Sequence, residues 1–251
     1  GCVSVSAVRK AFSEAASRYD AHASQQRAVL ERLVALAQPH CVADVPIYDL
    51  GCGTGSLKAC SDWPVIGIDS AQGMCQQSRF TGQISICADL HQLPLANSSV
   101  PQLFSSLALQ WSDDLPAAFD EFYRILQPGG VAALSCYMEG TLQELKNSFS
   151  QLNHADTTRD FPKVSLFIDL IKKAGFTAVL NESETLDIKS NRLILLLKYI
   201  KDIGAHTTSS SSKGLTTPRQ IDALEAVYPK TADDRITSSW HVGYFVIRKP
   251  A

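Results

Sequence analysis

The sequence lacks a long apolar run. Its stretch from Leu193 to Leu197 is five residues long, whereas a membrane-spanning helix needs roughly 20. The N-terminal residues also lack the charged flank and apolar core of a secretory signal. We therefore expect a soluble protein of the cytoplasm with no membrane partner.

The sequence also lacks paired cysteines. Its seven cysteines are an odd number, and no two of them form a C-x-x-C pair. This pattern disfavours both a disulfide framework and a zinc ribbon, so we expect reduced, mostly buried thiols. No histidines or carboxylates recur at a metal-ligand spacing, and no metal is expected. With 251 residues, 45% hydrophobic and 19% charged, the chain is long enough to bury a large core.

A strong net charge is absent as well, because the formal value is −2. The charge is nevertheless uneven: residues 1–32 carry +2, residues 33–158 carry −8 and residues 159–251 carry +4. Polyphosphate binding needs clustered Lys and Arg, so the acidic middle disfavours a nucleic-acid partner. The basic flanks are suited to an acidic partner.

Short apolar runs alternate with helical patterns over the middle of the chain, which is typical of a parallel, doubly wound sheet. We predict an α/β fold with a Rossmann-like, mostly parallel sheet and an antiparallel final strand. The predicted strands are 46–50, 65–68, 84–87, 103–107, 131–136, 176–188 and 238–247; the predicted helices are 54–61, 71–80, 115–126, 141–152, 164–174, 192–203 and 218–228.

The ends of the chain suggest additions to this sheet. Residues 6–38 carry two apolar stripes, which predict two helical pieces. Pro128-Gly129-Gly130 predicts a turn, and residues 207–212 predict a Ser/Thr-rich loop. We divide the chain into an N-terminal helical cap (1–38), an α/β core (39–189), a helical insertion or lid (190–235) and a final core strand (236–251).

The strongest motif is Asp49-x-Gly51-x-Gly53-x-Gly55, at the first crossing from strand to helix. Glycines two apart let the backbone approach a ligand closely. A dinucleotide site would need G-x-G-x-x-G, but its third glycine is replaced by Ser56. The acidic Asp49 suits a ligand that carries an ammonium group and no phosphate.

Two more acids follow the next two predicted strands. Asp69 is placed to accept both hydroxyls of a ribose, and Asp89 to accept from an adenine amine while Leu90 packs on the ring. Each acid alone is explained as well by capping the following helix. Together, ammonium, ribose and adenine indicate S-adenosylmethionine, with S-adenosylhomocysteine as product. The candidate cofactor-binding residues are Asp49, Gly51, Gly53, Gly55, Asp69, Ser70, Met74, Asp89, Leu90 and Ser106.

Over residues 45–137 the sequence resembles the class I S-adenosylmethionine-dependent methyltransferases. A narrower resemblance runs nearly end to end, to the malonyl-acyl carrier protein O-methyltransferase family of biotin synthesis. It is carried by segments that include Lys10-Ala11-Phe12, Leu107-Ala108-Leu109-Gln110-Trp111, Tyr123 to Gly130, Ile203 to His206 and Trp240-His241. Ser106, Asp202 and His206 depart from the family pattern.

The resemblance implies that the methyl acceptor is the free carboxylate of a malonyl thioester. A carboxylate with a pKa near 4 is already ionised at neutral pH and needs no general base. It needs a dry pocket with donors that hold one oxygen. The candidate catalytic residues are Tyr19, His241, Trp240, Gln110 and Trp111; each is equally understood as a core residue, and for Arg124 a surface ion pair is favoured.

An acidic malonyl-acyl carrier protein would be drawn to basic surface. Lys198 and Lys201 lie three apart on one predicted helix face, with Arg192 and Lys189 near them and Lys10 in the first helix. A solvated helix face explains the same pattern. Methylation of a free organic acid or quinone precursor, and a non-catalytic cofactor-binding subunit, remain as alternative functions.

Overall fold

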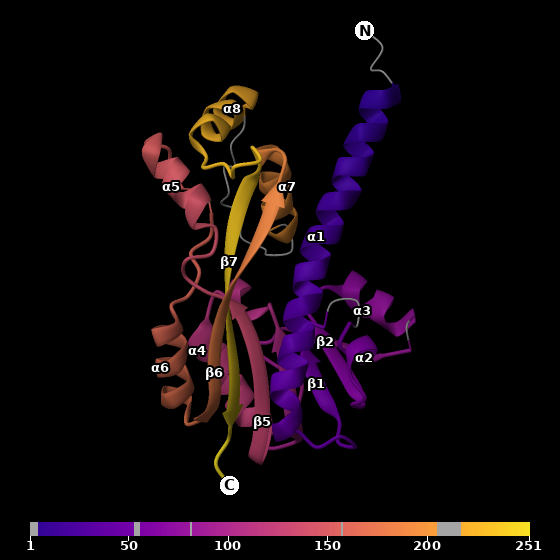
Figure 1. Ribbon diagram of the computed structural model, residues 1–251. Coiled ribbons are helices and arrows are strands. Elements are labelled where there is room, and N and C mark those ends of the chain that lie inside the picture. Colours follow the sequence, from indigo (N-terminus) through magenta and orange to yellow (C-terminus); the bar gives the residue numbers. More distant parts are fainter. Residues whose placement is uncertain (1–4, 53–55, 81, 157, 205–216) are drawn as a thin grey trace. The chain divides into compact units, whose positions relative to one another are not determined.

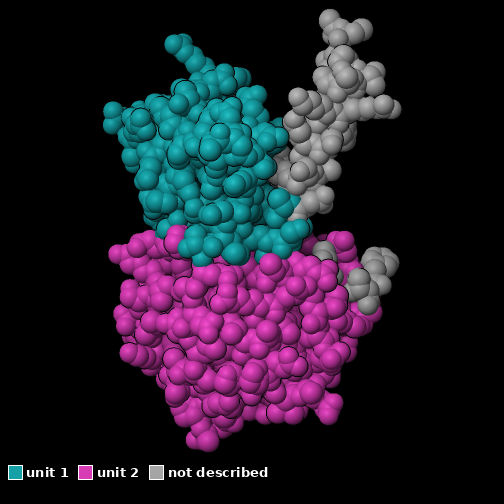
Figure 2. Space-filling model, viewed as in Figure 1, with its two compact units in different colours: residues 1–26, 140–160, 185–240 teal, residues 27–139, 161–184, 241–251 magenta. Residues whose placement is uncertain are grey.

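The computed structural model describes residues 5–52, 56–80, 82–156, 158–204 and 217–251, with the side chains of 5–20, 80 and 202–204 excepted. The chain divides into two compact units (Figure 2). Unit 1 comprises residues 1–26, 140–160 and 185–240, and unit 2 comprises residues 27–139, 161–184 and 241–251. The predicted insertion 190–235 falls within unit 1, which also takes in segments outside that range.

A seven-stranded sheet runs in the order β3-β2-β1-β4-β5-β7-β6. Figure 1 labels β1, β2, β5, β6 and β7 of this sheet. The pairs among the first five strands in this order are parallel, and β7 is antiparallel to β5. This confirms the predicted mostly parallel sheet with an antiparallel final strand. The strands are β1 (Ile47–Leu50), β2 (Val65–Asp69), β3 (Ile84–Cys87), β4 (Val100–Ser106), β5 (Leu126–Tyr137), β6 (Thr177–Ser190) and β7 (Ile236–Arg248).

The core of unit 2 is built from buried strand residues and from the apolar faces of two helices. Phe119 of α4 packs edge-to-face on Phe122 of the same helix and on Phe167 of α6, with ring centroids 6.0 Å and 5.4 Å away. Phe167 also packs on Phe245 of β7, with ring centroids 5.2 Å apart. These ring contacts join α4, α6 and β7 in the core of unit 2. The unit 2 helices are α2 (Ser56–Cys60), α3 (Gln72–Phe80), α4 (Leu115–Ile125) and α6 (Val164–Ala174).

Unit 1 holds most of the remaining helices. Its α8 begins with a capping box, in which Thr217 and Gln220 each bond the other's backbone, and Pro218 occupies the first turn. The predicted loop 207–212 lies outside the described residues. The helices are α5 (Gln143–Gln151), α7 (Leu193–Gly204) and α8 (Pro218–Val227), together with the first part of α1 (Val5–Ala37).

Two local predictions were wrong. Helix α1 is continuous from Val5 to Ala37, because residues 20–28 contain no glycine or proline that would break it. Pro128-Gly129-Gly130 is not a turn after a helix but part of β5. The pairing of β4 with β5 shifts register between Val100 and Gln102, and Gly129 absorbs the irregularity with a φ of +77°.

Candidate functional site

The sheet order reverses between β1 and β4, and open α/β sheets bind ligands at such a switch point. The loops after these two strands approach closely there. Gly51 has a φ of +72°, and a Cβ on it would lie 2.7 Å from the Cβ of Ala108. Both the backbone conformation and the space therefore require glycine at position 51. Gly53 and Gly55 lie outside the described residues.

Asp49 is a buried acid at this switch point. It is 5% exposed, and its carboxylate accepts no hydrogen bond from the residues that the structure describes. Burial, with a smaller contribution from the negative charge of Asp69, raises the pKa of Asp49 to about 8. A buried carboxyl group without a protein partner can be satisfied by a cationic ligand group.

Asp69 is the last residue of β2, and its Oδ1 accepts a hydrogen bond from the backbone N–H of Ala71 at 2.8 Å. This bond lies in the turn that leads into α3, whose first residue is Gln72. The same bond holds the half-buried carboxylate at the end of the strand, where a ribose is expected. Ser70 is exposed and Met74 is half-buried on the first turn of α3.

Asp89 follows β3 and is exposed. Its Oδ1 accepts from the backbone N–H of His91 at 2.8 Å and lies 2.7 Å from His91 Nδ1. These hydrogen bonds lower the pKa of Asp89. Leu90, beside it, is half-buried.

His91 is a residue that the sequence reasoning missed. Its Nε2 lies 2.6 Å from Ser112 Oγ, so the ring connects the loop after β3 with the residue that follows Trp111. The only local signal was its position two residues after Asp89, while the contact with Ser112 spans 21 positions.

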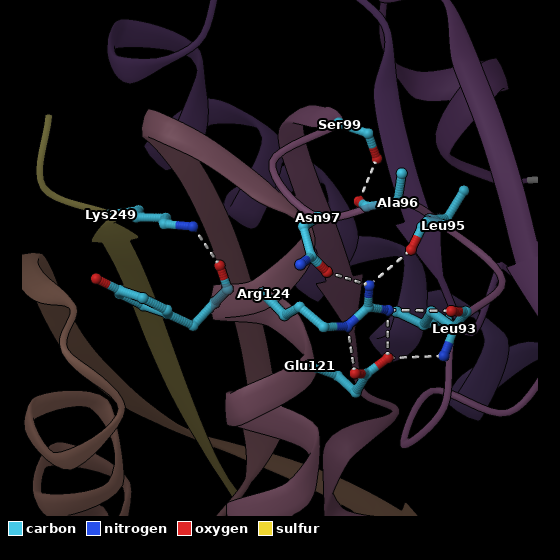
Figure 3. A network of polar contacts seen from close by, with 9 residues as sticks. Leu93, Leu95, Ala96, Asn97, Ser99, Glu121, Arg124 and Lys249 are labelled. Carbon is cyan, nitrogen blue, oxygen red and sulfur yellow. Dashed lines mark hydrogen bonds and ion pairs between the residues drawn. The ribbon is translucent and has the colours of Figure 1, made fainter.

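Arg124 fastens the same loop further along the chain (Figure 3). Its guanidinium donates to the carbonyls of Leu95 at 2.7 Å and Leu93 at 3.1 Å, and to Asn97 Oδ1 at 2.9 Å. It also pairs with Glu121, whose carboxylate accepts from Leu93 N–H at 2.8 Å. The expected ion pair is present, and the same Arg124 guanidinium also holds the loop that carries Asp89.

The β4 exit contains three further candidates. Ser106 is half-buried, and its hydroxyl lies 3.0 Å from that of Ser135 on β5. Gln110 is 3% exposed; its Nε2 donates to Leu107 O at 2.7 Å, and its Oε1 accepts from Tyr137 N at 3.4 Å. Its amide therefore holds backbone in place. Trp111 is half-buried, with its ring edge-to-face with Phe161 at 6.3 Å.

The remaining acceptor-side candidates belong to different parts of the chain. Trp240 lies in unit 1, where it is 1% exposed and donates from Nε1 to Ser238 Oγ at 2.9 Å. It packs edge-to-face on His22 and Tyr199, whose rings stack on each other. His241 lies in unit 2 and is half-buried. The side chain of Tyr19 lies outside the described residues.

Neither a metal site nor a membrane span emerges from the described part of the chain. Within it, no group of three or more His, Cys, Asp or Glu residues could hold a metal ion. None of the described helices is long and apolar enough to cross a membrane. None of the described cysteines forms a disulfide; Cys52, Cys75 and Cys136 are buried, Cys41 and Cys60 are half-buried and Cys87 is exposed.

The described residues of unit 2 fit S-adenosylmethionine. The buried Asp49 carboxyl, which accepts no hydrogen bond from the described residues, suits its ammonium group, and glycine at position 51 lets the loops after β1 and β4 approach closely beside it. Asp69 and Asp89 follow the next two strands outward from β1, in the order in which the ribose and the adenine follow the ammonium group along the ligand. A ligand with a phosphate group would need a cation at these positions, and all three are occupied by acids.

Comparison with known proteins agrees with this fit. A family model described as a methyltransferase domain matches residues 48–134. Malonyl-acyl carrier protein O-methyltransferase from Gallionella capsiferriformans is 33% identical over 263 residues, covering 98% of this chain and 91% of that protein. A biotin biosynthesis bifunctional protein from Cellvibrio japonicus is 32% identical over 97% of this chain and 50% of its own length.

Structural similarity extends to enzymes of much lower identity. Phosphoethanolamine N-methyltransferase 2 from Haemonchus contortus, solved with S-adenosyl-L-methionine, has a TM-score of 0.53 and 20% identity, covering 91% of this chain and 53% of that one. At this identity the likeness shows the fold alone. The near full-length match to curated relatives goes further, and this chain belongs to the malonyl-acyl carrier protein O-methyltransferase family.

Proposed function

We propose that this protein transfers the methyl group of S-adenosylmethionine to the free carboxylate of malonyl-acyl carrier protein, giving the methyl ester that enters biotin synthesis. The observation that carries the proposal is the buried Asp49 carboxyl at the switch point, with Asp69 and Asp89 at the ends of the next two strands. The family relationship supplies the acceptor.

The cofactor would supply an electrophilic methyl group on a sulfonium. The residues of this chain would mainly hold the cofactor and the malonyl carboxylate in position, since an in-line displacement is accelerated by holding the reactants in the right geometry. Asp49 would bind the ammonium group, Asp69 the ribose hydroxyls and Asp89 the adenine amine. Leu90 would pack on the ring. No residue needs to remove a proton from the acceptor, because a malonyl carboxylate is ionised at neutral pH.

On the acceptor side, we assign the malonyl carboxylate to Tyr19 and His241. Both are neutral or cationic donors that can hold one oxygen and leave the other free to attack. The polar atoms of Gln110 and the Nε1 of Trp240 have protein partners within their own units. We therefore give Gln110 a positioning role at the β4 exit, and keep Trp240 and Trp111 as candidate acceptor-side residues of their own units.

We place carrier docking on the basic side chains of α7 and its approach. Lys198, Lys201 and Lys189 are exposed and make no ion pair within the described residues. Arg192 instead pairs with Glu225, with Nε 3.0 Å from Oε1. The side chain of Lys10 lies outside the described residues. Acidic partners are steered by such unpaired cations. A cytoplasmic location belongs to the same proposal.

One assay tests the proposed function. The purified protein is incubated with methyl-labelled S-adenosylmethionine and malonyl-acyl carrier protein, and the carrier is analysed for label that mild base releases as methanol. We expect base-labile label on the malonyl carrier and none on the acetyl carrier, which has no free carboxylate. Label on free organic acids alone would favour the small-molecule alternative. Tight cofactor binding without turnover on any acid would favour a regulatory subunit.

A further inference from the structure

Two cysteine thiols meet beside the turn that carries Asp69. Cys87 is the last residue of β3, and Cys75 lies on the first turns of α3. The parallel pairing of β2 with β3 sets Asp69 opposite Cys87. The Cys75 thiol donates to the Asp69 carbonyl at 3.3 Å and lies 3.6 Å from the Ile86 carbonyl, while the Cys87 thiol lies 3.6 Å from the Ser70 carbonyl.

The two thiols contact the carbonyls of adjacent residues, Asp69 and Ser70, so both sulfurs lie beside the same turn. Burial is the largest cause that raises the pKa of Cys75, and the neighbouring Cys87 adds to it. The pair is unequal in access, because Cys75 is 1% exposed whereas Cys87 is exposed. This combination of an accessible thiol and a sheltered partner is typical of redox-sensitive pairs.

We propose that Cys75 and Cys87 form an oxidant-sensitive dithiol that regulates cofactor binding at the neighbouring Asp69. This inference rests on the proposed function, since it assigns Asp69 to the cofactor. The oxidant is hydrogen peroxide. The exposed Cys87 sulfur attacks it, the O–O bond breaks, and a sulfenic acid and one water form. The Cys75 sulfur then displaces the hydroxyl group as a second water. Two thiols are thereby oxidised to one disulfide, and one hydrogen peroxide is reduced.

Oxidation would disturb the turn for two reasons. Both S–H donors are lost, so the carbonyls of Asp69 and Ser70 lose their thiol contacts. A covalent S–S bond is also shorter than any non-bonded separation of two sulfurs, so the first turns of α3 are drawn toward β3. The Asp69 carboxylate is held by Ala71 N–H at the entry to α3. A shift of this helix therefore moves the carboxylate that is assigned to the ribose.

The experiment uses the reduced protein with and without hydrogen peroxide, followed by peptide mapping without reductant. We expect a linked pair of peptides carrying Cys75 and Cys87 and a mass lower by two hydrogens. Calorimetric affinity for S-adenosylhomocysteine should fall severalfold on oxidation and return with dithiothreitol. Cys87→Ser should keep its affinity after peroxide, whereas the matched control Cys60→Ser should respond as wild type does. Cys75→Ser, at the buried position, should likewise keep its affinity for S-adenosylhomocysteine after peroxide.

The absence of a linked pair, or a linked pair that leaves cofactor affinity unchanged, would overturn the dithiol. A reduced protein that does not bind S-adenosylhomocysteine would instead overturn the proposed function, whatever peptide mapping shows. Failure of the dithiol proposal is therefore seen in the peroxide-treated protein, and failure of the proposed function is seen in the reduced protein. Loss of affinity after peroxide in Cys87→Ser would also count against the proposal, because another oxidised residue would then be responsible.

Discussion

A single buried carboxyl group, that of Asp49, makes cofactor binding depend on pH. With its pKa raised to about 8, the group is mostly protonated in the free enzyme at pH 7, and a cationic ligand group would favour its ionised form. Cofactor binding at pH 7 should therefore release most of one proton, and affinity should rise as the pH approaches 8. Calorimetry in two buffers of different ionisation enthalpy measures this. In Asp49→Asn, the proton release should disappear and affinity should fall more than about tenfold.

The same carboxyl group affects the stability of the free protein. Its folded-state pKa lies above the unfolded value of about 4, so the folded state binds more protons between about pH 4 and 8 and loses stability as the pH rises through this range. Asp49→Asn should therefore gain stability relative to wild type as the pH rises, with the difference levelling off above about pH 8. If the free energy of unfolding depended on pH in the same way in wild type and Asp49→Asn, the Asp49 carboxyl would ionise as freely in the folded state as in the unfolded state.

Tyr19 and His241 provide the residue-scale test of the acceptor site. Tyr19→Phe and His241→Ala should each lower kcat by about tenfold or more, because one charge-assisted hydrogen bond is worth about 1.5 to 3 kcal/mol. Cofactor affinity should stay nearly unchanged, since neither residue is assigned to the cofactor. Steady-state kinetics and calorimetry separate the two effects. Turnover at the wild-type level in both variants would remove them from the acceptor site.

At the scale of elements, Arg124 of α4 holds the loop that leads from β3 to β4. Its side chain is 33% exposed, so part of each interaction is screened. Arg124→Ala should still lower the free energy of unfolding by about 1 to 3 kcal/mol, because two loop carbonyls and Glu121 lose their partner. Urea unfolding measures the loss. Arg79→Ala, which removes a guanidinium bonded to the carbonyl of Ser85, is the matched control and should cost less.

The elements were largely predictable because apolar periodicity decides them locally. Strand β3 and helix α6 have the predicted bounds, and the alternation of types predicted the parallel sheet. Features that depend on residues distant in the sequence were not predicted. The register shift opposite Pro128-Gly129-Gly130 depends on β4. The roles of Gln110 and His91 depend on their contacts with Tyr137 and Ser112. Sequence spacing does not encode such distant contacts.

At the scale of the whole molecule, charge should govern the encounter with the carrier. The double variant Lys198→Glu with Lys201→Glu should raise the KM for malonyl-acyl carrier protein severalfold, because exposed cations mainly set the association rate. Added salt should reduce wild-type activity on the carrier, since exposed charges are screened beyond about 8 to 10 Å at physiological ionic strength. Initial rates over a salt series measure both effects.

The same charge change elsewhere is the control. Lys172 and Lys173 of α6 are also exposed, and Lys172→Glu with Lys173→Glu should leave the KM for the carrier close to wild type. Activity on a small malonyl thioester should be nearly insensitive to either pair. If both double variants used the carrier equally well, docking would have to be assigned to another face.

The strand order also bears on the sequence of events during synthesis. Strand β7 follows the other six described strands along the chain, yet it lies between β5 and β6 in the finished sheet. While the chain is still emerging from the ribosome, the first five strands can pair, but the outer edge of β5 stays open and β6 has no place to bind. An unpaired edge is prone to join other chains. The interval before β7 is inserted is therefore the time at which the nascent protein is most exposed to aggregation.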